Sequence, residues 1–163
     1  MKTDMKKWMQ DCINAPTKKA LPILSFLGIQ LTGHTVDEIV RSGHLQAVCM
    51  EAIARKFDTA AAFSLMDLSV EAEAFGSPIH YSGDEVPTVT AALIRDEEEA
   101  EALQVPDVGA GRTGECVSGI REVSSLITDR PVLAGMIGPY SLAGRLLDMT
   151  EIMILCYEEP EMV

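Results

Sequence analysis

The sequence predicts an α/β fold, because three short apolar runs at residues 21–28, 59–64 and 131–138 alternate with amphipathic helical patterns. Apolar runs of this length, ended by turn residues, are typical of strands buried on both faces. Strand–helix–strand order favours parallel strands joined by right-handed crossovers. A closed TIM barrel needs eight strands and about 250 residues. We therefore expect a single domain over residues 1–163: a partial TIM (βα)8 barrel of about three βα units, with an excursion between strands two and three.

Apolar spacing and capping residues predict the helices before the second strand. An apolar stripe at helical spacing marks the N-terminal helix and consists of Met5, Trp8, Met9, Cys12 and Ile13. A Thr-x-x-Glu capping box at residues 35–38 opens a short helix. A longer helix follows, and its apolar face consists of Leu45, Val48, Cys49, Ala52 and Ile53.

Turn and capping signals organise the long segment between the second and third strands. Ser69 opens a helix that ends at Gly76, and the turn residues 82–84 predict a hairpin or an irregular excursion. Acidic residues 96–99 favour a helix N-terminus. A further amphipathic helix precedes the third strand, and its apolar positions are Cys116, Ile120, Val123 and Ile127.

The composition excludes several classes of function. A formal net charge of −12 and a pI of about 4.6 disfavour nucleic acid and anionic membrane surfaces as partners. No apolar run approaches the roughly 18 residues that cross a bilayer, and no apolar stretch follows the N-terminal lysines as in a secretory signal. Four scattered cysteines without a Cys-x-x-Cys pair predict neither a zinc ribbon nor a disulfide framework. We expect a cytoplasmic protein.

Two longer motifs give the sequence a family resemblance. FSLMDLSVEAEAFGSPIHYSGDEVPTV, residues 63–89, and RPVLAGMIGPYSLAGRLL, residues 130–147, resemble the uroporphyrinogen decarboxylase superfamily. Within it they are most similar to the branch of methylcobamide:coenzyme M methyltransferases. The resemblance extends from about Leu21 onward, and it implies that this chain is the N-terminal half of a longer barrel.

The methyltransferase branch implies transfer of a methyl group from methylcobamide, carried by a corrinoid protein, to a thiol or folate acceptor. In that branch zinc holds the acceptor thiol as the nucleophilic thiolate, through a His-x-Cys pair and a later cysteine. His34, His44 and His80 each lack a cysteine two residues later, so the zinc ligands are expected outside this chain. We expect a fragment or split subunit that is inactive alone and is completed by a C-terminal half polypeptide. The non-enzymatic alternative is an inactive half-barrel module whose open edges are covered by a second copy, another protein or a rearranged helix.

The decarboxylase branch is the alternative chemistry, an enzyme of tetrapyrrole metabolism that needs no metal. The resemblance implies an aspartate that matches Asp67, arginines that fall on residues 25–33, and a tyrosine that falls near Arg145. Residues 25–33 contain no arginine, and only the aspartate is present. Decarboxylation is therefore the less favoured of the two reactions.

Gly138, Pro139, Tyr140 and Ser141 are predicted to bind substrate. A proline at the first helical position leaves the following free N–H groups pointing out of the helix N-terminus. After a barrel strand these groups face the pocket, where they suit a carboxylate, a sulfonate or a phosphate. The alternative is a strand-to-helix turn that binds no ligand.

Asp67 is the candidate catalytic residue, because it follows the second strand, where barrel side chains project toward the substrate. It would orient a substrate N–H group or support a ligand; alternatively, it caps the helix that begins near Ser69. Glu71 and Glu73 are two helical positions apart and point in different directions, which makes them a poor acid–base pair.

Overall fold

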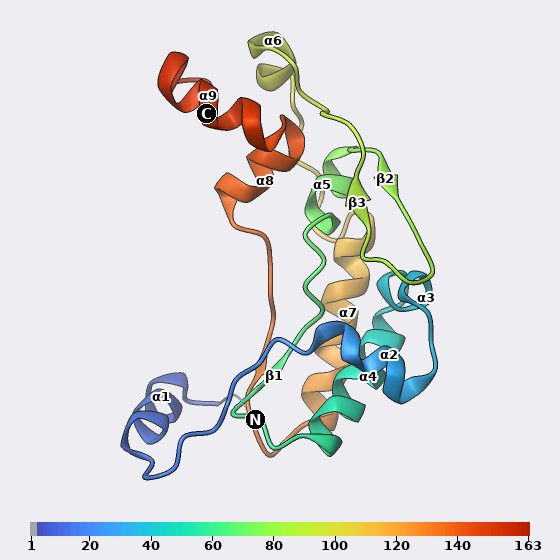
Figure 1. Ribbon diagram of the computed structural model, residues 1–163, viewed down its shortest axis with the longest axis vertical. Coiled ribbons are helices and arrows are strands. Elements are labelled where there is room, and N and C mark those ends of the chain that lie inside the picture. The colour runs from blue at the N-terminus through green and yellow to red at the C-terminus, as the bar shows by residue number, and fades with distance from the viewer. Residues whose placement is uncertain (1–2) are drawn as a thin grey trace.

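The computed structural model describes residues 3–163 as a curved, mainly helical molecule (Figure 1). Its elements, in chain order, are α1 (Met5–Asn14), the 3-10 helix η1 (Ser25–Leu27), α2 (Gly28–Thr32), α3 (Val36–Val40), α4 (Gly43–Lys56), β1 (Ala62–Phe63), α5 (Val70–Phe75), β2 (Ile79–His80), β3 (Thr88–Val89), α6 (Glu97–Glu101), α7 (Arg112–Leu126), β4 (Val132–Leu133), α8 (Pro139–Leu146) and α9 (Met149–Glu158). Within residues 3–163, no helix is long and apolar enough to cross a membrane.

Two parallel strands form the centre of the α/β arrangement. β1 pairs with β4 in the register Ala62↔Val132 and Phe63↔Leu133. The crossover between these strands contains α5, the antiparallel β2–β3 hairpin, α6 and α7. The excursion that the sequence predicts between its second and third strands therefore forms, and residues 81–87, which contain the predicted turn residues 82–84, connect the two strands of its hairpin.

Helices α4 and α7 pack along one another and carry the main core. This core consists of Ala47 and Met50 from α4, Ala62 from β1, and Val123 and Ile127 at the end of α7. The two helix backbones approach closely at glycines.

A second core lies at the other end of the molecule, where α5, α8 and α9 meet. Its buried residues are Ala72, Ile94, Leu146, Leu147 and Ile152. None of them belongs to the core around α4 and α7, so the described chain has two packing centres.

The expected first strand, residues 21–28, does not form. In its place the chain makes η1 and then α2, which pack on α4. Pro22 has no N–H group for a strand ladder, and a Cβ atom at Gly28 would lie 2.6 Å from the Cβ of Cys49. The glycine thus lets this segment fold closely over α4 in helical turns, which a buried apolar run permits as readily as a strand.

Other predicted elements are confirmed. The capping box of Thr35 and Glu38 opens α3, Asp96 caps α6 through the Glu99 N–H group, and α5 ends at Gly76 with a left-handed φ of 106°. Ser69 lies at the N-cap position of α5, but its side chain makes no capping hydrogen bond.

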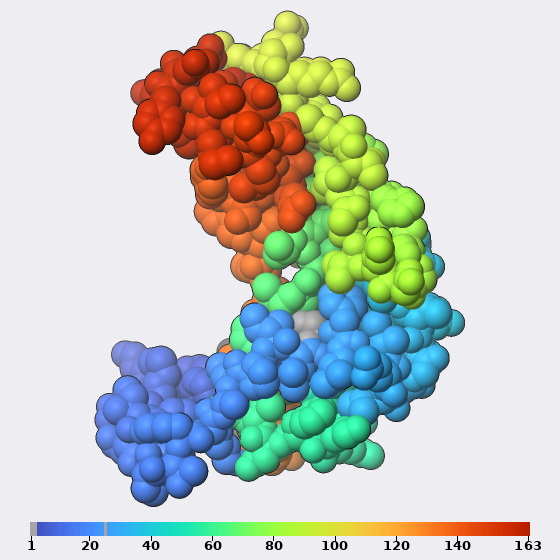
Figure 2. Space-filling view, in the orientation of Figure 1, coloured from blue at the N-terminus to red at the C-terminus, as the bar shows by residue number. Residues whose placement is uncertain are grey.

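Helix α1 stands apart from the rest of the chain, at one end of the curve (Figure 1). No residue of α1 is buried, and Met9 and Ile13 on its apolar stripe are 50% and 68% exposed. Figure 2 shows a concave side between α1 and the C-terminal helices α8 and α9.

Substituting Gly119→Ala tests the close approach of α4 and α7. A Cβ atom at this position would lie 2.7 Å from the Gly43 carbonyl oxygen, so we expect urea denaturation to show a loss of about 2 kcal/mol in the free energy of unfolding. The clash outweighs the gain of about 1 kcal/mol that alanine gives in a helix. Gly83→Ala is the control, because nothing lies within 4 Å of its added Cβ. Equal stability of the two variants would contradict the close approach.

Candidate functional site

A largely apolar cavity of about 600 Å³ opens at the carboxyl ends of both parallel strands. Its walls come from residues 64–68 after β1, residues 134–137 after β4, one side of α5, and the first half of α7. Smaller contributions come from α3, α4, α8 and the loop before α7. Ligands of α/β proteins bind at this end of parallel strands, so the cavity is the candidate functional site.

Arg112 and Asp67 form a buried ion pair in the cavity wall. The Arg112 side chain is 7% exposed and that of Asp67 is 1% exposed. Nη1 of Arg112 donates to Oδ2 of Asp67, Nε donates to Oε2 of Glu73, and Nη2 donates to the Ser69 hydroxyl at 2.8 Å. Burial by itself lowers the pKa of Arg112, but the hydrogen bonds and charges of Asp67 and Glu73 raise it above its ordinary value. The guanidinium therefore stays charged.

Asp67 uses both carboxylate oxygens within the protein. Oδ1 accepts from the Ser69 N–H group at 2.9 Å and from the Ser69 hydroxyl at 2.6 Å, while Oδ2 accepts from Arg112. The backbone contact fixes the turn that leads into α5, whose N-cap position is occupied by Ser69 rather than Asp67. The Arg112 contact places Asp67 in the cavity wall.

The aromatic side chain of Tyr81 contacts both Glu73 and Arg112. The Tyr81 hydroxyl donates to Oε1 of Glu73, and the Tyr81 ring lies between two guanidinium groups, 5.1 Å from Arg112 and 3.7 Å from Arg41. Burial and the hydrogen bond to Glu73 raise the pKa of Tyr81, so its proton stays on the phenol. Glu73 thus faces Arg112 and Tyr81, whereas Glu71 lines the cavity, in agreement with their expected divergence.

The cavity lining also contains an amide and a thiol. Gln46 on α4 is 4% exposed, and its Nε2 atom has no geometric hydrogen-bond partner among residues 3–163. Cys116 on α7 lies near this amide, and burial raises the pKa of its thiol. Cys116 is therefore a neutral group in the cavity rather than a thiolate.

The predicted substrate-binding turn lies beside the cavity. Gly138, Pro139, Tyr140 and Ser141 are exposed at the start of α8, and cavity residues flank them on both sides. Proline occupies the first turn of α8, and no side chain caps this helix. Burial and the Cys156 thiol of α9 raise the pKa of Tyr140, so its phenol stays neutral.

The described residues do not fit a zinc ion. No group of three or more His, Cys, Asp or Glu side chains within residues 3–163 is arranged to hold a metal. His34 lies 3.7 Å from Glu38, His44 lies 2.7 Å from Glu122, and His80 is exposed on the hairpin. The three histidines therefore lie at three separate places and share no site.

Sequence reasoning missed Arg112, Gln46 and Cys116. Arg112 carried a usable signal, because it opens α7, and a cation at a helix N-terminus is disfavoured by the helix dipole. Such a residue calls for a carboxylate partner nearby. Gln46 and Cys116 gave no comparable signal within their helical patterns.

The fold and the cavity define an α/β protein with a ligand site at the ends of its parallel strands. The chain belongs to the uroporphyrinogen decarboxylase family, whose profile (URO-D) matches residues 18–163. The methylcobamide:CoM methyltransferase MtbA of Methanosarcina acetivorans is 30% identical over 122 residues, which cover 67% of this chain and 36% of MtbA. A solved structure of a methyltransferase from Methanosarcina mazei superposes with a TM-score of 0.79 at 20% identity, over 99% of this chain and 50% of that one. This chain therefore spans half or less of the length of these relatives.

Replacing Asp67 tests how far the site depends on the buried ion pair. Asp67→Asn keeps the side-chain shape but removes the charge that faces Arg112, and loss of one partner of a buried pair costs about 3 kcal/mol or more. We expect this loss in the free energy of unfolding by urea denaturation. Asp129→Asn is the matched control, since its pair with Arg130 is exposed on the carboxylate side and is expected to contribute under about 1 kcal/mol. An equally small effect at Asp67 would contradict the structural role.

Proposed function

We propose that this chain is the N-terminal, substrate-binding part of a corrinoid-dependent methyltransferase built on a TIM barrel. The chain would supply part of the barrel, with β1 and β4 as adjacent strands, to an enzyme that transfers a methyl group from methylcobamide to a thiol or folate acceptor. The observation that carries the proposal is the apolar cavity at the carboxyl ends of β1 and β4. The similarity to two methyltransferases supports it.

The charges of the cavity favour methyl transfer over decarboxylation of a tetrapyrrole. The lining contains three carboxylates, those of Asp67, Glu71 and Asp107, and one guanidinium, that of Arg112. The tetrapyrrole substrates of the decarboxylase branch carry several carboxylates, which need cationic partners. Arg112 already faces two carboxylates of the protein, so it is poorly placed to bind another.

Each predicted site residue has a proposed role in this function. Asp67 acts as a positioning residue that orients Arg112 and the start of α5. Gly138, Pro139, Tyr140 and Ser141 present the free N–H groups of the α8 N-terminus beside the cavity mouth, and they are proposed to hold an anionic end of the acceptor outside it. The cavity then receives the uncharged remainder of the substrate.

Activation of the acceptor thiol is not assigned to this chain. The family branch uses zinc for this step, and residues 3–163 lack a ligand group for it. We therefore propose that the metal ligands are supplied by a C-terminal half polypeptide and that a corrinoid protein delivers the methyl group.

Exposed apolar side chains mark where such a polypeptide would dock. Met9 and Ile13 on α1 and Met136 after β4, which is 77% exposed, are large apolar side chains left in water. In addition, β1 and β4 have only each other as strand partners among the described residues. A complementing half-barrel is the proposed occupant, and a second copy of this chain is the alternative.

Complementation tests the proposed function directly. The chain is mixed with a polypeptide that comprises the part of MtbA beyond its match to this chain, with methylcobalamin, 2-mercaptoethanesulfonate and zinc. Demethylation of methylcobalamin, followed by its visible absorbance, is expected only when both polypeptides are present. The chain with zinc alone serves as the control. Absence of association between the two polypeptides, or demethylation by this chain alone, would refute the split arrangement.

Sedimentation of the isolated chain tests the exposed stripe of α1. Changing both Met9 and Ile13 to Ser removes apolar surface without touching a buried contact. If a second copy covers α1, the parent chain sediments as a dimer at high concentration and the double variant as a monomer. A parent chain that stays monomeric at all concentrations favours the complementing polypeptide and rejects the second copy.

A further inference from the structure

The cavity walls carry an excess of negative charge. Of the charged side chains that line the cavity, three are carboxylates and one is Arg112. Arg112 is already paired with Asp67 and also with Glu73, which lies behind the wall. Among the described lining residues no cation therefore remains for a ligand. An anion that entered the cavity would lose its hydration and meet like charges, which is strongly unfavourable.

Of the two lining carboxylates that are at least partly buried, Asp67 and Glu71, the protein leaves Glu71 less satisfied. Its Oε1 atom accepts one long hydrogen bond, 3.3 Å, from the Ile137 N–H group. Within residues 3–163 Glu71 has no ion-pair partner, and it is only partly exposed, beside apolar residues of the cavity. A carboxylate in such surroundings gains most from a hydrogen-bond donor or a cation brought by a ligand.

Gln46 on α4 offers a complementary group in the cavity lining. Its Nε2 atom is buried and meets only the weakly accepting Cys116 thiol. A buried amide donor without a good acceptor is costly, so a ligand oxygen or nitrogen with a lone pair would satisfy it. The lining thus presents an acceptor on α5 and a donor on α4 in an otherwise largely apolar cavity.

We propose that the group entering this cavity is uncharged or cationic, carries a hydrogen-bond donor for Glu71 and, where it is uncharged, an acceptor for Gln46, and is otherwise apolar. Alcohols and amides on an apolar body supply both the donor and the acceptor, and an ammonium group supplies the donor alone, whereas carboxylates and sulfonates are excluded. The inference rests on the proposal that the cavity is the substrate site of the enzyme. It restricts that substrate: any anionic end stays outside the cavity.

Three probes that share the same phenyl ring but differ in their polar group test this specificity. Benzylamine, benzyl alcohol and benzoate are titrated separately into the isotope-labelled chain, and binding is followed by NMR chemical shifts of cavity residues. We expect benzylamine and benzyl alcohol to bind at least about tenfold more tightly than benzoate. In Glu71→Gln, which keeps the oxygen that faces Ile137, benzylamine is expected to weaken by about tenfold and benzoate to tighten.

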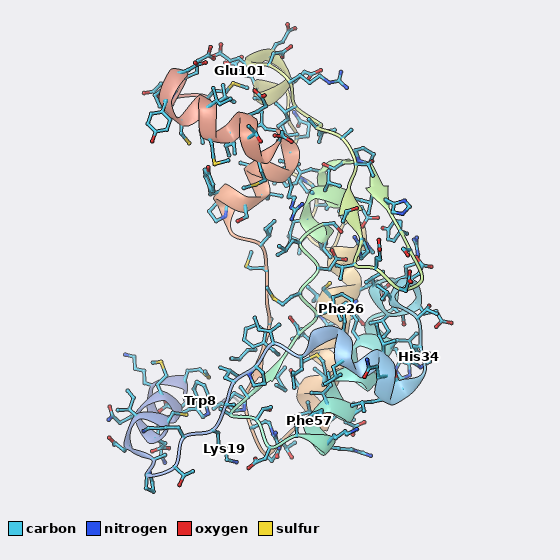
Figure 3. The ribbon with its side chains drawn as sticks, viewed as in Figure 1. Trp8, Lys19, Phe26, His34, Phe57 and Glu101 are labelled. Atoms are coloured by element: carbon cyan, nitrogen blue, oxygen red, sulfur yellow. The ribbon has the colours of Figure 1, made fainter. Side chains whose placement is uncertain are left out.

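Glu101→Gln is the matched control, because Glu101 lies exposed on α6, far from the cavity (Figure 3). This variant should keep the parent order of affinities. Benzoate binding as tight as that of benzyl alcohol, an unchanged benzylamine affinity in Glu71→Gln, or no binding of any probe would overturn the inference. If the affinity order holds but complementation with the MtbA polypeptide fails, the methyltransferase proposal falls and the cavity specificity stands. If methyl transfer is restored but the three probes do not bind in the expected order of affinity, the proposed cavity specificity is refuted and the methyltransferase proposal stands.

Discussion

The buried guanidinium of Arg112 is the contact on which the site depends. It joins the first residue of α7 to the turn after β1, through Asp67 and Ser69, and to α5, through Glu73. Without these partners a buried cation at a helix N-terminus would be opposed both by desolvation and by the helix dipole. A single side chain therefore joins three of the four segments that form the main walls of the cavity.

The sequence predicted those features whose cause is local. The capping box at Thr35 and Glu38, the acidic start of α6 and the glycine end of α5 each depend on residues within one helical turn, and all three are present. The apolar run 21–28 was misread as a strand, because short apolar runs are compatible with both strand and helix. Packing of Gly28 against α4 decides between them, and no local pattern contains that contact.

The candidate site shows the same division. Asp67 could be singled out from its place after a strand, but its partner Arg112 lies 45 residues away in the sequence. Glu73 and Arg112 are 39 residues apart. The unsatisfied amide of Gln46 becomes visible only when α4 is placed against α7. The residue types of the site could be read from the sequence, but the pairing of residues far apart in the chain could not be predicted from it.

The two packing centres of the chain have a consequence for how it responds to a ligand. Ile120 of α7 packs on the core around α4, whereas Phe75 and Leu142 pack on the core around α8 and α9. All three side chains also line the cavity. A molecule bound there would contact side chains of both cores at once. It would thus supply apolar contacts between two cores that have no buried residue in common. Ligand binding would then couple the unfolding of the two ends of the molecule. The free energy that the ligand adds to this coupling would rise with the logarithm of its concentration.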